Sequence, residues 1–446
     1  MRPLTLEQIA KFSGGEAIGS GVVEQITIDS RLATAGSLFV ALVGEKRDGH
    51  EFVSDVLAKG GFAMVRKGFS DQPGLIVVDD PLLGLQNFAT AYLAERDIPV
   101  VAVTGSNGKT STKDMIAQVL RSRYAVHSTQ GNYNNEIGVP LTVLGVGEGD
   151  EVLVAEMGMR GLGHIKRLTE ICPPDLGVIT NIGPVHLELL GSMGNVAQAK
   201  GELLEALDED GVAILNGDDP SVRGQARSFK GKIIYYGLDA ANDLVASGIA
   251  IDLEGRPSFN VRYEGQEAQV TLAVPGVHNV WNACAALAVG ARFGVTLQAG
   301  AEALADLTLS AMRLEVQRTP DGIVVLNDSY NASPASMKVA LDTLAHMYCS
   351  GQRIAILGDM LELGDMAEEA HLDIGAYAKR SATQLFFIGE YAPLMQEGAG
   401  TGQVFATVED FLATGFEASE DDLVLIKASR GLKFERIVDQ LMKGGS

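Results

Sequence analysis

The sequence has 446 residues with 57 acidic and 35 basic side chains, and its formal net charge of −22 argues against a nucleic acid or an anionic membrane surface as the partner. Since one hydrophobic core rarely serves a chain of this length, we expect two or three domains. The cysteines Cys172, Cys284 and Cys349 lie far apart in the sequence, which fits a reducing compartment. The N-terminus lacks the apolar core of a signal peptide, and no uncharged run of about 18 apolar residues occurs. The sequence therefore predicts a cytoplasmic protein that does not insert into a membrane.

Residues 1–97 are predicted to form a small mixed α/β domain. Short strand-like pieces occur at 25–30, 37–42, 61–65 and 75–80, and the turns between them are rich in Gly and Asp. The apolar helical stretch LLGLQNFATAYLAERD at 82–97 ends this block.

Residues 98–311 are predicted to form a central domain built on a parallel or mixed sheet. Apolar strand-like runs alternate here with helical stretches, which is typical of a parallel sheet covered by helices. The runs lie at 98–104, 124–128, 152–158, 175–183, 211–219 and 232–237, and a strand-rich insert at 259–276 and a helix at 279–293 follow them.

Residues 312–446 are predicted to form a smaller, Rossmann-like domain. The runs GIVVLND, RIAILGD, QLFFIG and DLVLIKAS are separated by helical or loop segments, as in a doubly wound sheet. The expected fold class is therefore α/β with three domains.

The stretch PVVAVTGSNGKTST at 99–112 predicts a phosphate-binding loop between a strand and a helix. Backbone N–H groups at such a helix start bind phosphate, Lys109 would neutralise its charge, and the Thr110 hydroxyl would ligate magnesium. Two residues separate the glycines where the common loop has four, so a family with a shorter loop is implied. An ordinary glycine turn is the alternative. The predicted ATP contacts are Gly105, Ser106, Asn107, Gly108, Lys109, Thr110 and Ser111.

Two further side chains are candidate metal ligands. Glu156 ends the apolar strand VLVAE, where a carboxylate often completes a nucleotide-bound magnesium site. His186 follows the run DLGVITNIG, and a neutral imidazole can bind a metal. The alternatives are a solvated carboxylate at the sheet rim and a polar loop histidine.

Several motifs in order resemble the Mur ligases, the ATP-dependent family that forms amide bonds in bacterial cell-wall synthesis. They are TGSNGKTS, NIGPVHLE, GVHNVWNACAA, MRLEV and NDSYNASPASM. GNYNNEIGVP, NDSYNASPASM and LGDMLELGD are most similar to members that add D-alanyl-D-alanine to UDP-N-acetylmuramoyl-tripeptide, and no DNPR motif of a diaminopimelate-adding member is present.

The resemblance implies that a substrate carboxylate attacks the γ-phosphate of ATP and that an amine opens the resulting acyl phosphate. It assigns catalytic roles to Lys109, Glu156, His186, Lys200 and Arg313. It also implies two Mg²⁺ sites, one with Thr110 and Glu156 and a second with His186. Lys200 would be carbamylated and would bind magnesium. Without the resemblance, the simpler interpretation of Lys200 is a solvated lysine on a helix, and that of Arg313 is a surface arginine.

The resemblance also assigns binding residues in each domain. Asn282 would meet the adenine and Asp328 the ribose, so the third domain would have to close on the central one. The uridine nucleotide and tripeptide would contact Ser30, Arg31, Asp48, His50, Asn134 and Asn135. The dipeptide would contact Asn331, Asp359, Ser429 and Arg430, beside an Ala428 where the family favours glycine. Turn formation is the simpler interpretation of Ser30 and the paired asparagines.

Other functions are compatible with parts of the pattern. The chain could add another amino acid within the same superfamily, resemble folylpolyglutamate synthetases, or be a switch or transport ATPase that ligates nothing. A catalytically silent relative is disfavoured because Lys109, Thr110, Glu156 and His186 are all present. We expect a monomer that acts on small molecules. The sequence is compatible with either lysine or diaminopimelate as the third residue of the substrate peptide.

Overall fold

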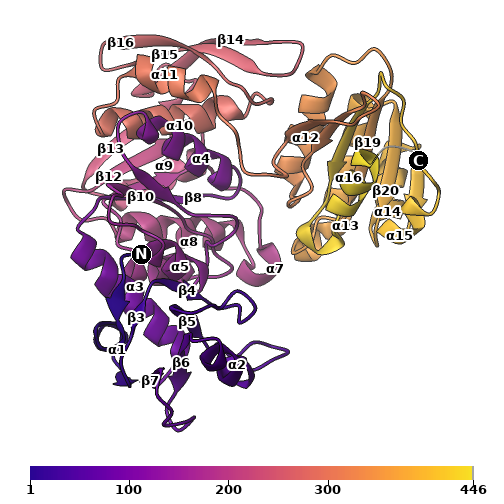
Figure 1. Ribbon diagram of the computed structural model, residues 1–446. Coiled ribbons are helices and arrows are strands. Elements are labelled where there is room, and N and C mark those ends of the chain that lie inside the picture. Colours follow the sequence, from indigo (N-terminus) through magenta and orange to yellow (C-terminus); the bar gives the residue numbers. More distant parts are fainter. Residues whose placement is uncertain (444–446) are drawn as a thin grey trace.

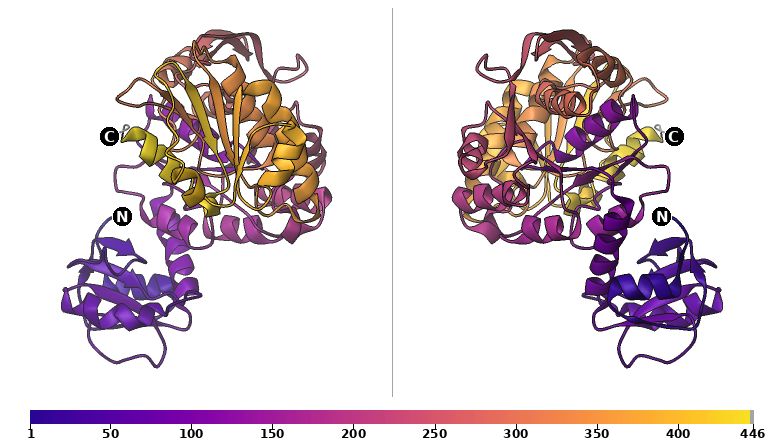
Figure 2. Two further views of the ribbon diagram at one scale, coloured as in Figure 1. Left: turned by 90° about the vertical axis from the view of Figure 1, so that its right-hand side faces the viewer. Right: turned by 90° about the vertical axis from the view of Figure 1, so that its left-hand side faces the viewer.

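The computed structural model describes residues 1–443 and confirms an α/β fold with three domains, each built on its own sheet (Figure 1). The first domain lies at one end of the molecule and projects from the other two (Figure 2). Within residues 1–443, no helix is both long enough and apolar enough to cross a bilayer.

The first domain has a five-stranded sheet in the order β2-β7-β6-β5-β4, in which only β2 runs antiparallel to its neighbour. A separate antiparallel pair, β1 (Leu4–Thr5) and β3 (Val22–Val23), lies beside it. The sheet strands are β2 (Glu16–Ile18), β4 (Gln25–Thr27), β5 (Ser37–Val40), β6 (Phe62–Arg66) and β7 (Leu75–Val78). The helices are α1 (Leu6–Ser13), η1 (Gly49–Phe52), α2 (Val53–Ala58) and α3 (Pro81–Arg96).

Helix α3 connects the first domain to the central one. It begins where the Asp80 carboxylate accepts from the N–H groups of Leu82 and Leu83, and Pro81 fits the first helical position. Its buried residues Phe88 and Tyr92 belong to one continuous core with side chains of α1 and of the central helices. The two domains are therefore joined by packed apolar surface as well as by the chain.

The central domain has a nine-stranded mixed sheet in the order β16-β15-β14-β13-β12-β11-β8-β10-β9. The strands from β9 to β14 are parallel, and β14, β15 and β16 form an antiparallel meander. The strands are β8 (Val100–Thr104), β9 (Val126–Ser128), β10 (Val152–Glu156), β11 (Leu176–Ile179), β12 (Val212–Asn216), β13 (Lys232–Gly237), β14 (Leu244–Ile251), β15 (Pro257–Tyr263) and β16 (Gln266–Thr271).

Helices cover both faces of this sheet, because successive side chains of a buried strand point to opposite faces. In β8, Val101 and Val103 pack with α4, α10 and α11, whereas Val100 and Ala102 pack into the core shared with α3, α5, α6 and α8. The helices are α4 (Lys109–Arg121), α5 (Gly138–Leu144), α6 (His164–Ile171), α7 (Leu187–Leu190), α8 (Met193–Glu205), α9 (Pro220–Gln225), η2 (Ala226–Ser228), α10 (Asn279–Arg292) and α11 (Leu297–Ala305).

The third domain is doubly wound, with a six-stranded sheet in the order β17-β18-β22-β19-β20-β21. Only β17 is antiparallel; α12, α13 and α14 pack on one face, and α15 and α16 on the other. The strands are β17 (Glu315–Arg318), β18 (Val324–Asn327), β19 (Arg353–Gly358), β20 (Gln384–Ile388), β21 (Gln403–Phe405) and β22 (Leu423–Lys427). The helices are α12 (Pro334–His346), η3 (Gly364–Met366), α13 (Ala367–Ser381), α14 (Ala392–Ala399), α15 (Val408–Leu412), η4 (Arg430–Leu432) and α16 (Glu435–Met442).

Candidate active site

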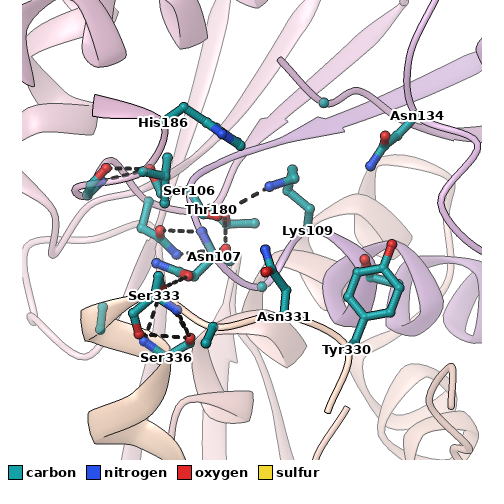
Figure 3. Close-up of a pocket in the computed structure, with 18 of the residues that line it drawn as sticks. Ser106, Asn107, Lys109, Asn134, Thr180, His186, Tyr330, Asn331, Ser333 and Ser336 are labelled. Carbon is teal, nitrogen blue, oxygen red and sulfur yellow. Dashed lines mark hydrogen bonds between the residues drawn. The ribbon is translucent and has the colours of Figure 1, made fainter. Parts of the chain in front are cut away.

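A cavity of about 1000 Å³ lies between the central and third domains, at the carboxyl ends of parallel strands of both sheets. Such crevices are where open α/β sheets bind ligands. Figure 3 shows part of its lining. The candidate residues that line it are Ser106, Asn107, Gly108, Lys109, Thr110, Ser111, Asn134, Asn135, Glu156, His186, Asn282, Arg313, Asp328, Asn331, Ser429 and Arg430.

The loop between β8 and α4 has a backbone shape that requires its two glycines. Gly105 has φ 154°, and a Cβ there would lie 1.8 Å from Thr180 Oγ1. Gly108 has φ 77°, and a Cβ there would lie 2.8 Å from Asn282 Oδ1. No other residue type fits either position without displacing a neighbour.

The segment after β11 holds this loop in place. Asn107 N–H donates to Asn181 Oδ1 at 2.9 Å, and Asn107 O accepts from Thr180 Oγ1 at 2.7 Å. Ser106 Oγ donates to Gly183 O at 2.9 Å. The first backbone bond of α4 runs from Thr112 N–H to Gly108 O, so the earlier N–H groups lack an intrahelical acceptor, and an anion could bind at this helix start.

Lys109 lies folded back over its own loop. Its Nζ donates to Gly105 O at 2.8 Å and to Ser106 O at 3.2 Å. Burial lowers the pKa of Lys109, and the nearby Glu156 carboxylate raises it. Both acceptors of the Lys109 ammonium group are therefore neutral carbonyl oxygens, and a bound anion could take their place.

Glu156 presents a carboxylate oxygen suited to a metal ion. The residue is 2% exposed; Asn134 Nδ2 donates to its Oε1 at 2.6 Å, whereas its buried Oε2 has no partner within residues 1–443. No cluster of three or more His, Cys, Asp or Glu side chains that could hold a metal occurs in the same part of the chain. This donor set fits Mg²⁺, which takes one or two protein oxygens beside water and phosphate. Asn134, predicted as a substrate contact, here orients Glu156.

His186 contacts the third domain. It has φ 51° at the start of α7, and its Nδ1 pairs with the Glu362 carboxylate. Burial lowers the pKa of His186, whereas the contact with Glu362 raises it. With Nδ1 engaged, Nε2 is the nitrogen that could ligate a metal.

Lys200, predicted as a catalytic residue and metal ligand, is buried in α8 and does not line the cavity. It is 1% exposed, and burial together with the charge of Lys109 lowers its pKa well below the ordinary value. Burial at this position therefore favours the neutral amine over the ammonium form.

The third domain meets the phosphate loop at two points. Arg313 Nη2 donates to Thr110 Oγ1 at 3.2 Å, and Ser333 Oγ donates to Asn107 Oδ1 at 2.9 Å. Figure 3 shows Ser333 and Ser336, at the start of α12, beside Asn107. The hydroxyl of Thr110, predicted as a metal ligand, is thus bonded to Arg313 in this structure.

The two residues predicted to meet the nucleoside are held by internal bonds. Asn282 Oδ1 accepts from Thr112 Oγ1 at 3.0 Å, and its Nδ2 donates to Asn279 Oδ1 at 2.9 Å. Asp328 Oδ2 accepts from Lys427 Nζ at 2.5 Å, and its Oδ1 accepts from Leu314 N–H at 3.1 Å. Their roles toward ATP stay predictions.

Among the candidates for the dipeptide, Asn331, Ser429 and Arg430 line the cavity and Asp359 does not. The Asp359 carboxylate accepts from the N–H groups of Glu390 at 2.8 Å and Tyr391 at 3.0 Å, while burial raises its pKa. Asn135 also has a local bond, because its Oδ1 accepts from Gly138 N–H at 2.8 Å.

The first-domain candidates Ser30, Arg31, Asp48 and His50 lie outside this cavity. Arg31 pairs with Asp29, and the Ser30 carbonyl accepts from Lys59. Asp48 Oδ1 lies 2.6 Å from His50 Nδ1, and His50 Nε2 accepts from Arg66 N–H at 3.1 Å. These bonds shape the loops of the first domain, and the contact of the loops with a nucleotide stays a prediction.

Sequence reasoning missed several residues of the site. They are Thr180, Asn181, Tyr330, Ser333, Glu362 and Lys427, all of which line the cavity. Four of them fall inside stretches already quoted as motifs, but a single sequence does not show which members of a motif face a ligand.

Two stretches of the chain match models of known families. Residues 103–290 match the Mur ligase middle domain, and residues 312–430 match the domain described as Mur ligase, glutamate ligase domain. The UDP-N-acetylmuramoyl-tripeptide--D-alanyl-D-alanine ligase of Bacillus subtilis (strain 168) is 41% identical over 434 residues, covering 95% of this chain and 94% of that one. MurF from Acinetobacter baumannii is 29% identical with a TM-score of 0.89, covering 99% of both chains. The MurF ligase from Thermotoga maritima, solved in complex with ADP, is 27% identical with a TM-score of 0.84, covering 94% of this chain and 97% of that one.

Proposed function

Since this chain belongs to the Mur ligase family and is an ATP-dependent ligase that joins D-alanyl-D-alanine to UDP-N-acetylmuramoyl-tripeptide, we propose that the reaction takes place in the cavity between its central and third domains. The observation that carries this proposal is that the third domain reaches the phosphate loop, through Arg313 to Thr110 at 3.2 Å and Ser333 to Asn107 at 2.9 Å. A site shared by two domains suits a ligase, which must bring a phosphoryl donor and two further substrates together.

The proposed route passes through an acyl phosphate. A terminal carboxylate oxygen of the tripeptide attacks the γ-phosphorus of ATP, the bond to the bridging oxygen breaks, and ADP leaves. The amine of D-alanyl-D-alanine then attacks the acyl carbon, loses a proton, and displaces phosphate. Lys109, Arg313 and the N–H groups at the start of α4 stabilise the negative charge that both steps concentrate.

Magnesium is expected at the same place. Thr110 and Glu156 would hold one ion, supported by the partnerless Glu156 Oε2, and His186 would contribute to a second. When bound, the metal neutralises charge on the phosphate oxygens. Asn134 keeps Glu156 aimed at this position through its 2.6 Å bond.

The burial of Lys200 supports its carbamylation. A neutral amine can attack carbon dioxide, forming an N–C bond and losing a proton, and the product is a carboxylate that suits a site already containing Lys109. Carbon-13 NMR of the enzyme in labelled bicarbonate should show a carbamate signal in the wild type. That signal should be absent after Lys200→Arg, and a wild-type spectrum without it would contradict the assignment.

The remaining assignments follow the predicted domain boundaries. Residues 1–97 would bind the uridine nucleotide, 98–311 would bind ATP, and 312–446 would bind the dipeptide and complete the ATP site. The dipeptide contacts are Asn331, Ser429 and Arg430, with Asp359 acting behind the wall, since its carbonyl accepts from Ser429 N–H at 3.1 Å. We further propose a monomer that works in the cytoplasm, which sedimentation and cell fractionation would test.

Phosphate release by the purified protein tests the function. With ATP and magnesium, release should require both UDP-N-acetylmuramoyl-tripeptide and D-alanyl-D-alanine, and the mass of the product should be that of the pentapeptide. Hydrolysis that ignores both substrates and forms no amide would overturn the proposal.

A further inference from the structure

Arg313 sits on a backbone that is fixed on both sides. The residues next to it, Met312 and Leu314, have φ of 62° and 49°, a left-handed conformation that is uncommon for such side chains. Met312 N–H donates to Glu315 Oε2 at 2.9 Å, and Leu314 N–H donates to Asp328 Oδ1 at 3.1 Å. These bonds determine where the Arg313 side chain starts, but they do not determine where its guanidinium group ends.

The ring of Tyr330 holds that far end. The Arg313 Cζ atom lies 3.9 Å from the centre of the Tyr330 ring, which is the shortest such contact found within residues 1–443. The Tyr330 N–H also donates to Met312 O at 3.4 Å. The backbone that carries the Tyr330 ring is therefore bonded directly to the residue before Arg313. An aromatic face attracts a guanidinium group most strongly where water is partly excluded, as in this half-buried wall.

The same ring faces a second cation of the cavity. Arg430 Cζ lies 5.9 Å from the ring centre, and its guanidinium is otherwise close only to Glu435 at 3.4 Å and the Met312 sulfur at 3.5 Å among the described residues. The Tyr330 ring therefore lies near the guanidinium groups of both Arg313 and Arg430, two like charges that repel each other. Figure 3 shows the Tyr330 ring among the residues that line the cavity.

We propose that Tyr330 is a positioning residue of the ligase reaction. Its ring holds the Arg313 guanidinium group against the phosphate loop, so that the guanidinium is already in place before phosphoryl transfer begins. This inference rests on the proposed role of Arg313 at the transferring phosphate. A group already in place at the start of the reaction contributes to the rate of the chemical step more than to the binding of ATP.

The test measures kcat and the KM for ATP of the full-length ligase with both peptide substrates saturating. Tyr330→Leu should lower kcat by roughly tenfold and change KM by less than roughly threefold, because the π face is lost. Tyr330→Phe, which keeps that face, should retain at least roughly half of kcat. Tyr377→Leu is the matched control, since Tyr377 also faces a cation, Lys338 at 5.6 Å, but lies outside the cavity.

A double-mutant cycle separates this inference from the function on which it rests. If Tyr330 acts through Arg313, then Arg313→Ala and the double variant should have the same kcat. Independent, multiplying losses, or a Tyr330→Leu enzyme as fast as the wild type, would overturn the inference alone. An Arg313→Ala enzyme with wild-type kcat would overturn the role of Arg313 as well. Should Tyr330→Leu melt at a much lower temperature, Tyr330→Trp supplies the test, since it keeps a π face and should keep kcat.

Discussion

Replacing Asp328 by asparagine is expected to destabilise the third domain by about 3 kcal/mol, the lower end of the cost of breaking a buried ion pair. Asp328 follows β18 and Lys427 ends the neighbouring β22; their side chains are 11% and 2% exposed and lie 2.5 Å apart. The carboxylate uses one oxygen for Lys427 and the other for Leu314 N–H. An amide has only one acceptor, so either the ammonium or the N–H group would face another donor.

Hydrogen exchange in β18 and β22 is the appropriate assay, because the single tryptophan, Trp281, lies in the central domain and its fluorescence does not report on the third. A loss of about 3 kcal/mol should speed exchange through domain unfolding by roughly a hundredfold. Lys338→Met is the matched control: its ion pair with Asp373 is exposed and should contribute less than about 1 kcal/mol. Equal losses of protection in the two variants would refute the argument from burial.

The effect of pH on this variant has a definite sign. Burial lowers the pKa of Lys427 from its ordinary value of 10.5, and Asp328 raises it. With the folded pKa lowered, the unfolded chain binds more protons, so stability rises with pH between the folded value and 10.5. Removing Asp328 widens that interval, so the deficit of Asp328→Asn should be largest at neutral pH and shrink as the solution becomes alkaline.

Three further outcomes are expected at the site. Glu156→Gln should slow phosphate release at least roughly a hundredfold with little change in melting temperature, since it removes the charge of a buried oxygen that has no protein partner. Asn134→Ala should raise the magnesium concentration for half-maximal rate by roughly tenfold, because it frees Glu156 from its 2.6 Å bond; an unchanged magnesium dependence would contradict this. Gly108→Ala should weaken ADP binding in calorimetry by more than roughly tenfold, because its Cβ meets Asn282, whereas Gly163→Ala, with φ 80° but open space around the Cβ, should leave it nearly unchanged.

Much of the fold could be predicted because buried strands and helices of α/β domains differ in period. The apolar runs predicted in the central and third domains are strands of their sheets, and the insert at 259–276 contains β16 and all but the first two residues of β15. The strand β14 at 244–251 is not predicted. Its register shifts between Ser247 and Ala250, and Gly248 has φ 64°, so the alternation that marks a strand is interrupted.

The site was predictable where its chemistry lies in one continuous motif, as in the loop from Gly105 to Thr110. Sequence reasoning fails where function depends on pairs distant in the chain. The contact of His186 with Glu362 joins residues 176 positions apart, and the contact of Arg313 with Tyr330 depends on how the tyrosine ring is oriented toward the guanidinium group. Neither property leaves a trace in spacing or composition.

The continuous core around α3 has a mechanical consequence. Because Phe88 and Tyr92 pack with side chains of both the first and the central domain, these two domains should move as one body, while only the third swings. The distance from the site that would bind the nucleotide end of the substrate to the phosphate loop should then stay constant when the third domain moves. An extended peptide residue covers about 3.3–3.6 Å, so a substrate one residue shorter should stop that far from the γ-phosphate. We therefore expect the enzyme to select its substrate by length before any side chain is recognised.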